Sequence, residues 1–433
     1  MPFKILSLDG GGSWAMIQAR VLLDLYGDVD GHAILHQFDM AIANSGGSLV
    51  LACLCNNMKP SAIINIFESE EKRKMVFSPL TFWEKLKPTD LISLLRGIIH
   101  MGPKYSAERK YTGLRQLFIQ NQNVPIEDGI VFDTKLSHLP SLIKKKSLQL
   151  LFVGFDYFRE RANFFRSNLK SETDKFSIGN QFDISLGYAI QSSSNAPVNY
   201  FDAPATVHIQ SHPGGMGRET WYWDGAVSGF NNPVLAGVVE ATTNNKNGLK
   251  PSDFHVLSIG TATASFAVIT DYPKSQDPYL REIARHNKTN PLAITKTVFR
   301  FFNDVRKMAT SILDDPPDSA TFIAYSMLDP TLSGLANLVR INPCLQPELD
   351  AESKKFVVPE VYKHKEKDFI ALVEMDMDAT ENDQVKLIHD LCDKFITEDK
   401  IALPNQLIRG NKDGYHLGYK TYREAKAAWN LLK

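Results

Sequence analysis

The chain has 433 residues, of which 43% are apolar and 22% are charged. This balance is typical of a globular protein with a sizeable core, and it excludes disordered and collagen-like chains. The 48 Lys and Arg residues are matched by 49 Asp and Glu residues. Because no excess of positive charge exists to hold a phosphate backbone, we expect no nucleic-acid partner.

Four cysteines, at positions 53, 55, 344 and 392, have neither the spacing of a metal or redox motif nor the density of a disulfide scaffold. We expect them to be buried thiols in a reducing compartment. Residues 1–7 lead into an apolar segment without the charged region and cleavage site of a signal peptide. The one long uncharged stretch, residues 40–58, is interrupted by Asn, Ser and Gly. We therefore expect a cytoplasmic protein, or one peripheral on membranes, and a leaderless secretion route stays open.

Short apolar runs alternate with helical patterns along the chain. Residues 3–8 form an apolar run that ends near three glycines, after which apolar residues recur at helical spacing. Residues 38–43 repeat this arrangement and lead through a sharp turn into an apolar helix that ends near residue 55. Further strands are predicted at residues 149–155, 220–223 and 254–259. The alternation predicts an α/β fold: a three-layer αβα sandwich with a mostly parallel central sheet.

A serine occupies the turn between the second strand and its helix. Ala43 and Gly47 stand two positions before and after Ser45, and such small residues let a strand and a helix approach closely around a tight turn. The serine Oγ would then project near a helix amino terminus, whose partial positive charge favours a developing alkoxide. For this pentapeptide alone, an ordinary Ser/Gly turn is the alternative.

Three consecutive glycines, Gly10, Gly11 and Gly12, follow the first strand. A glycine loop of this kind lets backbone N–H groups point at an anion, either a phosphate or the oxyanion of a reaction intermediate. A dinucleotide site would require the spacing G-x-G-x-x-G, which is absent because Ser13-Trp14-Ala15 follows. A purely structural glycine turn is the other interpretation.

Asp224 ends the aromatic strand predicted at residues 220–223, and a helix is expected to begin near Pro233. A carboxylate at the carboxyl end of a strand in an α/β protein faces the crevice where ligands bind. The aromatic side chains at 221–223 could desolvate it and raise its pKa. An aspartate that only caps its own turn is the alternative.

The order and spacing of these motifs resemble those of the patatin-like phospholipases. The resemblance rests on Asp-Gly-Gly-Gly at 9–12, Ala-x-Ser-x-Gly at 43–47, and Asp-Gly-Ala at 224–226 with Asn-Asn-Pro at 231–233. Segments at 192–197, 200–201 and 339–343 also resemble family segments, so the similarity covers roughly residues 3–395. The chain departs from the family at Ala43, where glycine is usual, and at residues 13–15, where x-Arg-Gly is common.

The resemblance implies a Ser/Asp dyad, with Ser45 as nucleophile, Asp224 as general base, and the N–H groups of Gly10, Gly11 and Gly12 as oxyanion hole. It implies a lipid acyl hydrolase that cleaves acyl esters of phospholipids through a covalent acyl-enzyme, with no metal and no organic cofactor. The expected partners are a phospholipid or another acyl ester, together with peripheral membrane contact. A protein or nucleotide activator, which some family members need, stays open.

Two other functions stay open at this point. A thioesterase or broad carboxylesterase could use the same dyad. A phosphate- or lipid-binding module without catalysis could hold its ligand in the glycine loop and keep Ser45 as an inert turn residue. A Ser-His-Asp triad is disfavoured, because no histidine after Asp224 stands in a motif of that kind.

We expect residues 1–400 to form the lipid acyl hydrolase domain and residues 401–433 to form a basic tail. The tail holds six Lys and Arg against two acidic residues and ends in a predicted short helix, which would either dock on the domain or bind an anionic bilayer. Apolar residues at helical spacing over 91–99 predict a second helix, which would act as a packed cap or as a membrane contact.

Overall fold

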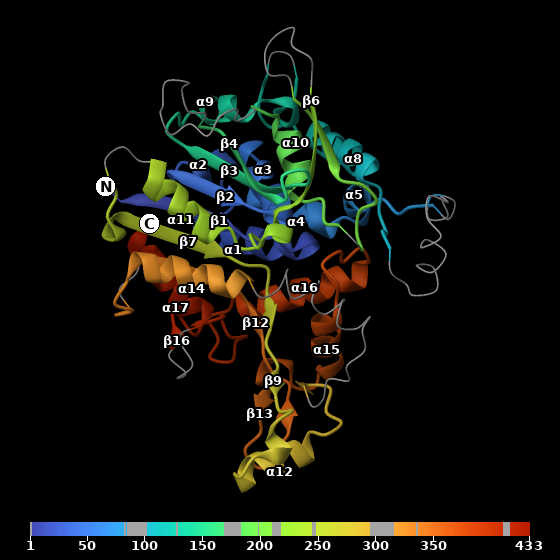
Figure 1. Cartoon of the computed structure of the whole chain (residues 1–433), viewed down its shortest axis with the longest axis vertical. Helices are drawn as coiled ribbons and strands as arrows, with labels where there is room; N and C mark the ends of the chain where they lie inside the picture. Colours follow the sequence, from blue (N-terminus) through green and yellow to red (C-terminus); the bar gives the residue numbers. More distant parts are fainter. Residues whose placement is uncertain are drawn as a thin grey trace.

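The computed structural model describes residues 2–81, 84, 102–126, 129–168, 183–197, 199–209, 218–244, 248–294, 316–334, 337–409 and 416–433. The helix predicted over residues 91–99 lies outside these ranges. Figure 1 shows the described elements arranged around a central sheet, from which a narrower arm projects.

The central sheet has eight strands in the order β11-β7-β1-β2-β3-β6-β5, with β4 paired to β3 outside this path. The strands are β1 (Phe3–Leu8), β2 (Met40–Ala43), β3 (Gln149–Asp156), β4 (Arg161–Arg166), β5 (Ala205–Ile209), β6 (Arg218–Asp224), β7 (Phe254–Ile259) and β11 (Leu338–Ile341). The pairs β11·β7, β7·β1, β1·β2 and β2·β3 are parallel. The pairs β3·β4, β3·β6 and β5·β6 are antiparallel. The predicted α/β fold with a mostly parallel sheet is confirmed.

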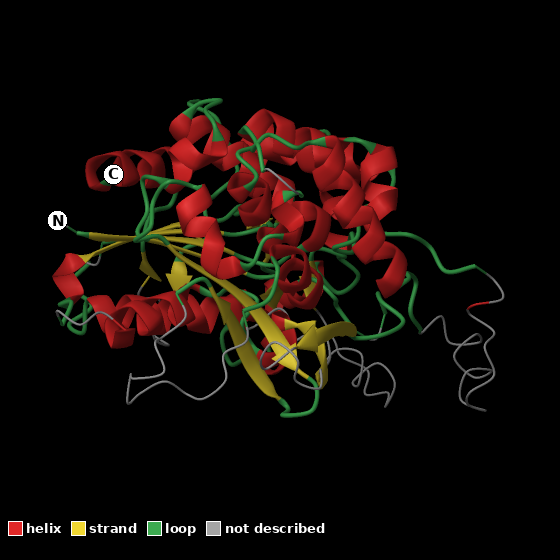
Figure 2. Ribbon diagram, turned by 90° about the horizontal axis from the view of Figure 1, so that it is seen from above, coloured by secondary structure: helices red, strands yellow, loops and turns green. Residues whose placement is uncertain are grey.

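Alternating side chains of the strands enter two hydrophobic layers, because successive residues of a strand point to opposite faces of the sheet. On β1, Leu6 and Leu8 pack in the larger layer with helices such as α1, α3 and α16. Ile5, which precedes Leu6 and points to the opposite face, packs in the smaller layer with α11 and α14. Helices therefore cover both faces of the sheet, as Figure 2 shows.

The helices vary from one turn to four turns in length. They are α1 (Met16–Tyr26), α2 (Gly31–Leu35), α3 (Ser45–Cys55), α4 (Pro60–Glu68), α5 (Glu70–Val76), α8 (Ala107–Gln120), α9 (Leu139–Leu142), α10 (Leu186–Ser193), α11 (Val234–Asn244), α12 (Pro278–His286), α14 (Pro316–Leu328), α15 (Glu366–Glu374), α16 (Asn382–Phe395) and α17 (Tyr422–Leu432). In the described part of the chain, none of them is long and apolar enough to cross a membrane.

The projecting arm in Figure 1 carries α12 and several two-residue strands. These are β8 (Thr263–Ala264), β9 (Ala267–Val268), β10 (Ala293–Ile294), β12 (Cys344–Leu345), β13 (Glu348–Leu349) and β14 (Phe356–Val357). The arm has a small apolar cluster of its own that includes Ile269, Ile283 and Ala293. A further pair, β15 (Ile408–Arg409) and β16 (His416–Leu417), lies near α14.

The last helix, α17, packs into the larger hydrophobic layer. Its Trp429 side chain is completely buried, stacks on Phe38 with ring centroids 5.9 Å apart, and donates a hydrogen bond of 2.8 Å from Nε1 to Tyr26 Oη. Removing a buried aromatic side chain of this kind typically costs about 3–5 kcal/mol. Trp429 therefore belongs to the core and is not available to insert into a bilayer.

The four cysteines are all buried and unpaired. Burial in apolar surroundings raises the pKa of Cys53 and of Cys392 to about 12. Because the thiolate is the reactive form of cysteine, these thiols are chemically inert in the folded protein.

Candidate active site

Ser45 lies at the sharp turn between β2 and α3, as the sequence predicts. It is the first residue of α3 and has a φ of 48°, in the left-handed region that residues other than glycine rarely adopt. Backbone strain of this kind at the start of a helix is the hallmark of a nucleophile elbow. The Ser45 side chain is nearly buried, with 5% of the residue exposed.

The small residues predicted to flank the elbow are required by packing. A Cβ atom at position 47 would lie 2.6 Å from the carbonyl oxygens of both Leu8 and Asp9, so only glycine allows α3 to approach β1 this closely. Ala43, the last residue of β2, is completely buried between the parallel neighbours β1 and β3.

The glycine loop lies beside the elbow, but its three N–H groups are not equivalent. The Gly10 N–H donates a hydrogen bond of 2.8 Å to the Asn231 carbonyl oxygen. Gly12 has a φ of 56°, and a Cβ atom there would come within 2.3 Å of the Met377 carbonyl oxygen, so no other residue fits this turn. Among the hydrogen bonds of the described residues, none engages the N–H of Gly11 or Gly12.

Asp224 reaches the elbow for a different reason from the one that the sequence suggests. Asp224 stands at the carboxyl end of β6. Because β6 runs antiparallel to β3, this end would ordinarily lie at the edge of the sheet opposite to Ser45. The pairing register compensates, because Asp224 aligns with Gly154, only two residues before the end of β3. The displaced register of β6 thus brings Asp224 to the level of the turn at Ser45.

The Asp224 carboxylate is buried, with 2% of the residue exposed, and it accepts several hydrogen bonds. Its Oδ1 accepts from Asn44 Nδ2 at 3.0 Å and from the Ala226 N–H at 2.9 Å. Burial raises the pKa of Asp224, and hydrogen bonds from Ala226, Ser45 and Asn44 oppose this shift by stabilising the carboxylate. Ser45 is therefore one of the groups around the Asp224 carboxylate, and its chain neighbour Asn44 donates to that carboxylate directly.

The aromatic wall expected around Asp224 is only partly formed by its strand neighbours. Tyr222 is buried, with 3% exposed, and packs edge-on against Phe165. Trp221 is 36% exposed and points away from the site, because strand residues alternate between faces. The expectation that Trp221 desolvates Asp224 is therefore wrong.

A serine outside the three motifs fixes the position of the turn at Ser45 through hydrogen bonds. Ser193, at the end of α10, accepts a hydrogen bond of 3.1 Å from the Ser45 N–H. Its hydroxyl also lies 2.7 Å from Ser48 Oγ and donates to Asn44 Oδ1 at 3.3 Å. Two residues later, the Asn195 carbonyl oxygen accepts from the Asp224 N–H at 3.1 Å. The segment 192–197, noted above only for its family resemblance, therefore fixes the positions of both Ser45 and Asp224.

A buried ion pair lies at the start of the glycine loop. Arg340 on β11 donates to Asp9 Oδ2 at 2.6 Å and to Ser258 Oγ at 2.8 Å. Desolvation by burial raises the pKa of Asp9 to about 6, although the charge and hydrogen bond of Arg340 act in the opposite direction. Asp9 and Arg340 thus anchor the end of β1, from which the loop begins.

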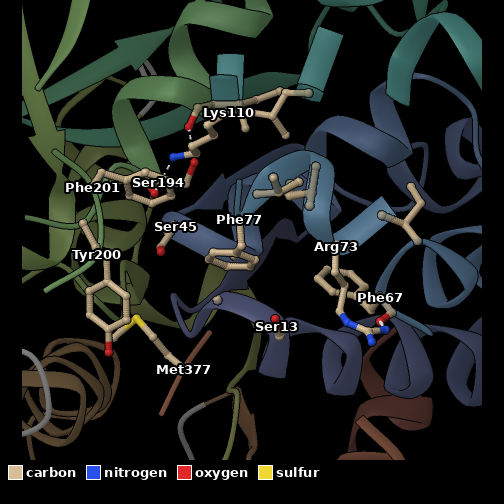
Figure 3. A pocket seen from close by; sticks show the side chains of 18 of the residues that line it. Ser13, Ser45, Phe67, Arg73, Phe77, Lys110, Ser194, Tyr200, Phe201 and Met377 are labelled. Atoms are coloured by element: carbon tan, nitrogen blue, oxygen red, sulfur yellow. Dashed lines mark hydrogen bonds between the residues drawn. The ribbon is translucent and has the colours of Figure 1, made fainter. Parts of the chain in front are cut away.

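A cavity opens at Ser45. Its polar side chains come from the turn, the glycine loop, α5, α8 and Ser194, whereas its apolar side chains come from α3, α4, α5, α8, α10, the segment around residue 200 and Met377 (Figure 3). The apolar residues of the lining are Leu49, Ile66, Phe67, Val76, Phe77, Leu114, Ile190, Ala196, Tyr200, Phe201 and Met377. Such a lining suits a hydrocarbon chain.

Two buried cations, Arg73 and Lys110, line this cavity, and the sequence analysis singled out neither of them. Lys110, on α8, is 1% exposed, and its Nζ donates a hydrogen bond to the Ser194 carbonyl oxygen (Figure 3). A lysine in an amphipathic helix is normally a solvated residue, so the sequence around Lys110 gives no sign of this position. As for metals, no cluster of three or more His, Cys, Asp or Glu side chains that could hold an ion occurs among the described residues.

Comparisons with solved structures give distant matches. VipD from Legionella pneumophila is 10% identical, with a TM-score of 0.31, over 86% of this chain and 74% of that chain. Full-length ExoU in complex with SpcU, from the type III secretion system of Pseudomonas aeruginosa, is 15% identical, with a TM-score of 0.25, over 45% of this chain and 38% of that chain. A further structure of the type III effector ExoU is 12% identical, with a TM-score of 0.24, over 90% and 89%. No curated protein gives a significant sequence match.

A comparison with protein families is decisive where these structures are not. The pattern of the patatin-like phospholipases matches residues 6–238, which is more than half of the chain and includes the glycine loop, the elbow at Ser45 and Asp224. The chain therefore belongs to the patatin-like phospholipase family.

Proposed function

We propose that this protein is a lipid acyl hydrolase of the phospholipase A type, with Ser45 as nucleophile and Asp224 as general base. The observation that carries the proposal is the position of the strained, nearly buried Ser45 beside the buried Asp224 carboxylate, which accepts a hydrogen bond of 3.0 Å from the chain neighbour Asn44. Family membership supplies the reaction class, and the apolar cavity that opens at Ser45 supports an acyl substrate.

In the proposed first step, Asp224 accepts the Ser45 hydroxyl proton while Oγ attacks the ester carbonyl carbon. The carbonyl oxygen becomes an oxyanion, which re-forms the carbonyl as the ester C–O bond breaks; the alcohol leaves with the proton that Asp224 took from Ser45, and the acyl group remains on Ser45. Water, deprotonated by Asp224, then attacks the acyl carbon, and Asp224 returns this proton to Ser45 Oγ as the bond to the acyl group breaks and the fatty acid leaves. Asn44 and the Ala226 N–H hold the carboxylate throughout, because both donate to its Oδ1.

For the oxyanion hole, we propose the N–H groups of Gly11 and Gly12 as the main donors. The Gly10 N–H is already engaged by the Asn231 carbonyl oxygen, so Gly10 serves chiefly to bring the loop close to Ser45. Gly12 and Gly46 line the same cavity as Ser45, which supports a donor role for backbone groups at this point. Loss of one such donor typically costs a factor of about 10² to 10³ in rate.

The residues of the dyad do not distinguish a phospholipase from a thioesterase or a broad carboxylesterase. A long apolar cavity favours long acyl chains, because each buried CH₂ group contributes about 0.8 kcal/mol. A binding module without catalysis is disfavoured, since it has no need for a serine in a strained conformation beside a buried carboxylate. We propose residues 1–400 as the hydrolase domain, with residues 401–433 packed on it through α17.

The test of this function is a comparison of substrates. We expect mass spectrometry to detect free fatty acid and lysophospholipid after incubation of the protein with phosphatidylcholine vesicles. Soluble esters and thioesters with short acyl chains should be cleaved with a lower kcat/KM, because a short chain leaves the apolar cavity unfilled. A higher kcat/KM on thioesters than on phospholipids would contradict the phospholipase assignment and favour the runner-up.

We also propose that the protein contacts membranes through the tip of the β3–β4 hairpin. Tyr157 and Phe158 at the tip are 48% and 53% exposed and form an aromatic cluster with Trp221, whose ring centroid lies 5.0 Å from that of Phe158. Arg159 and Arg161 accompany the cluster and are exposed. Tyr, Trp and Arg are the side chains that suit the interface of an anionic bilayer.

The position of this tip relative to Ser45 supports the membrane proposal. β2 and β3 are parallel, with Ala43 aligned to Phe152, so the hairpin tip projects beyond the edge of the sheet on which the elbow lies. A membrane at the tip would therefore face the catalytic edge.

Replacing Tyr157, Phe158 and Trp221 with serine should lower co-sedimentation with phosphatidylserine-containing vesicles about tenfold or more, because the apolar contact is lost. Hydrolysis of a soluble short-chain ester should stay unchanged. The matched control replaces Val268 and Ile294, which are exposed apolar residues of the arm at 58% and 37%, and should sediment like the wild type. Equal sedimentation of the tip variant and the control would refute the membrane contact.

A further inference from the structure

Lys110 is a buried cation in the candidate catalytic cavity that the proposed reaction steps do not use. Its Nζ lies 4.2 Å from the centroid of the Phe201 ring and donates a hydrogen bond to the Ser194 carbonyl oxygen. Figure 3 shows this ammonium group and the Ser45 side chain in the wall of the same cavity. The group is thus held on the active-site side of α8, away from solvent.

A charged group in this position is costly to the fold. Burial lowers the pKa of Lys110, and the negative charge of Asp224 opposes that shift. Methionine would fill the same space without the cost of desolvating a charge. Packing alone therefore does not account for a lysine here.

Hydrogen bonds to two consecutive residues, Ser194 and Asn195, connect Lys110 to Asp224. Among the described residues, Lys110 is the one cation whose charge lowers the pKa of Asp224, against the opposing effect of burial. Its hydrogen bond goes to Ser194 and not to the carboxylate, so Lys110 acts on Asp224 through space. The hydrogen bond to Ser194 fixes the position of Lys110 relative to Asp224, because the carbonyl oxygen of the next residue, Asn195, accepts a hydrogen bond from the Asp224 N–H.

We propose that Lys110 is a positioning residue that keeps Asp224 ionised, so that the carboxylate can accept the proton of Ser45. The inference rests on the proposed function and adds to it a third side chain, carried by a different helix. It assigns no contact between Lys110 and the reacting atoms.

The other charged groups near Lys110 are committed to other partners. On α8, Arg109 pairs with Glu84 and Arg115 with Asp133. On α5, Arg73 donates to three carbonyl oxygens, and Lys72 donates to Asn65. Asp202 accepts from the Ala107 N–H at the start of α8. The remaining charged residue on α8, Glu108, is exposed.

The pH dependence follows from the sign of this interaction. Asp224 is active as a base only when it is ionised, and loss of the positive charge of Lys110 would raise the pKa of Asp224 further. At a given pH, a smaller fraction of a Lys110→Met variant would then be active. The deficit should shrink as the pH rises, because Asp224 ionises again and because Lys110 itself loses its charge in the wild type.

The test is the rate at which a fluorophosphonate probe labels the intact protein, measured as a function of pH. We expect Lys110→Met to be labelled about tenfold more slowly than the wild type at neutral pH, since one unit in pKa is a factor of ten, and to approach the wild-type rate at alkaline pH. Its thermal stability is measured alongside, because removing one partner of a buried pair of charges destabilises a fold at every pH, whereas the loss in labelling should depend on pH. Lys110→Gln, which retains a donor for Ser194 but no charge, should behave in the same way, whereas Arg115→Met on the same helix should match the wild type.

Two outcomes would overturn the inference. One is a pH profile of Lys110→Met that coincides with that of the wild type, and the other is a loss of equal size at every pH. Wild-type behaviour of Lys110→Gln would likewise assign the effect to the hydrogen bond and reject the role of the charge. Ser45→Ala in the same assay tests the proposed function separately from the role of Lys110. If this variant is still labelled, the proposed function itself fails.

Discussion

The Ser45→Ala variant is expected to lose hydrolysis of phospholipid vesicles almost completely, by a factor of about 10⁴ to 10⁶, because the bond-forming oxygen is removed. It should also resist covalent labelling by a fluorophosphonate probe. The substitution deletes a single oxygen atom from a residue that is 5% exposed, so the fold should persist. Mass spectrometry of the labelled protein measures the result directly and also identifies the modified residue.

An exposed serine provides the control for this variant. Ser265 lies on the arm, is exposed, and uses its backbone N–H to bond Leu345, so Ser265→Ala should retain full activity and labelling. Labelling of the Ser45→Ala protein at the wild-type rate would show that another residue is the nucleophile.

Asp224→Asn is expected to lower kcat by a factor of about 10³ to 10⁴, as carboxamides do in place of catalytic aspartates. The amide has nearly the same shape and can still accept hydrogen bonds from Asn44 and the Ala226 N–H through its oxygen, but it cannot take up the Ser45 proton. Desolvation raises the pKa of Asp224, so the wild-type rate should fall as the pH is lowered and the carboxylate is protonated. In Asp224→Asn this acid limb should disappear from the pH profile of the residual rate.

The matched control is Asp271→Asn, an exposed aspartate on the arm, which should leave both the rate and the pH profile unchanged. Steady-state kinetics across a range of pH values distinguishes the two variants. If Asp224→Asn keeps more than about a tenth of the wild-type kcat, Asp224 is not the general base.

Much of the fold could be read from the sequence because its strands are short, apolar and bounded by glycine turns. The predicted strand at residues 3–8 coincides with β1, and that at 254–259 coincides with β7. The turn at Ser45 and the helix to Cys55 were also predicted correctly. These features depend on residues that are adjacent in the sequence, so the sequence is sufficient to predict them. The arm was not predicted, because its strands have only two residues each, and β4 was not predicted, because only one of its six residues is buried.

The site was predictable only where its residues belong to a local motif. The glycine loop, the elbow and Asp224 each follow a strand, whereas Ser193, Arg340 and Lys110 act across 148, 331 and 84 residues, respectively. Lys110 has the sequence neighbours of an ordinary surface lysine, and the packing of α8 against α5 and α10 turns it inward. Contacts of this kind depend on tertiary structure, which neither composition nor spacing reveals.

The burial of the four cysteines has a practical consequence for studying this protein on membranes. With Cys53, Cys55, Cys344 and Cys392 enclosed and unpaired, the native chain already behaves as a background without accessible thiols. A single cysteine placed at the exposed position 158 would then be the one site open to a maleimide dye or a nitroxide spin label. Depth measurements with such a reporter could be made without first replacing any natural cysteine.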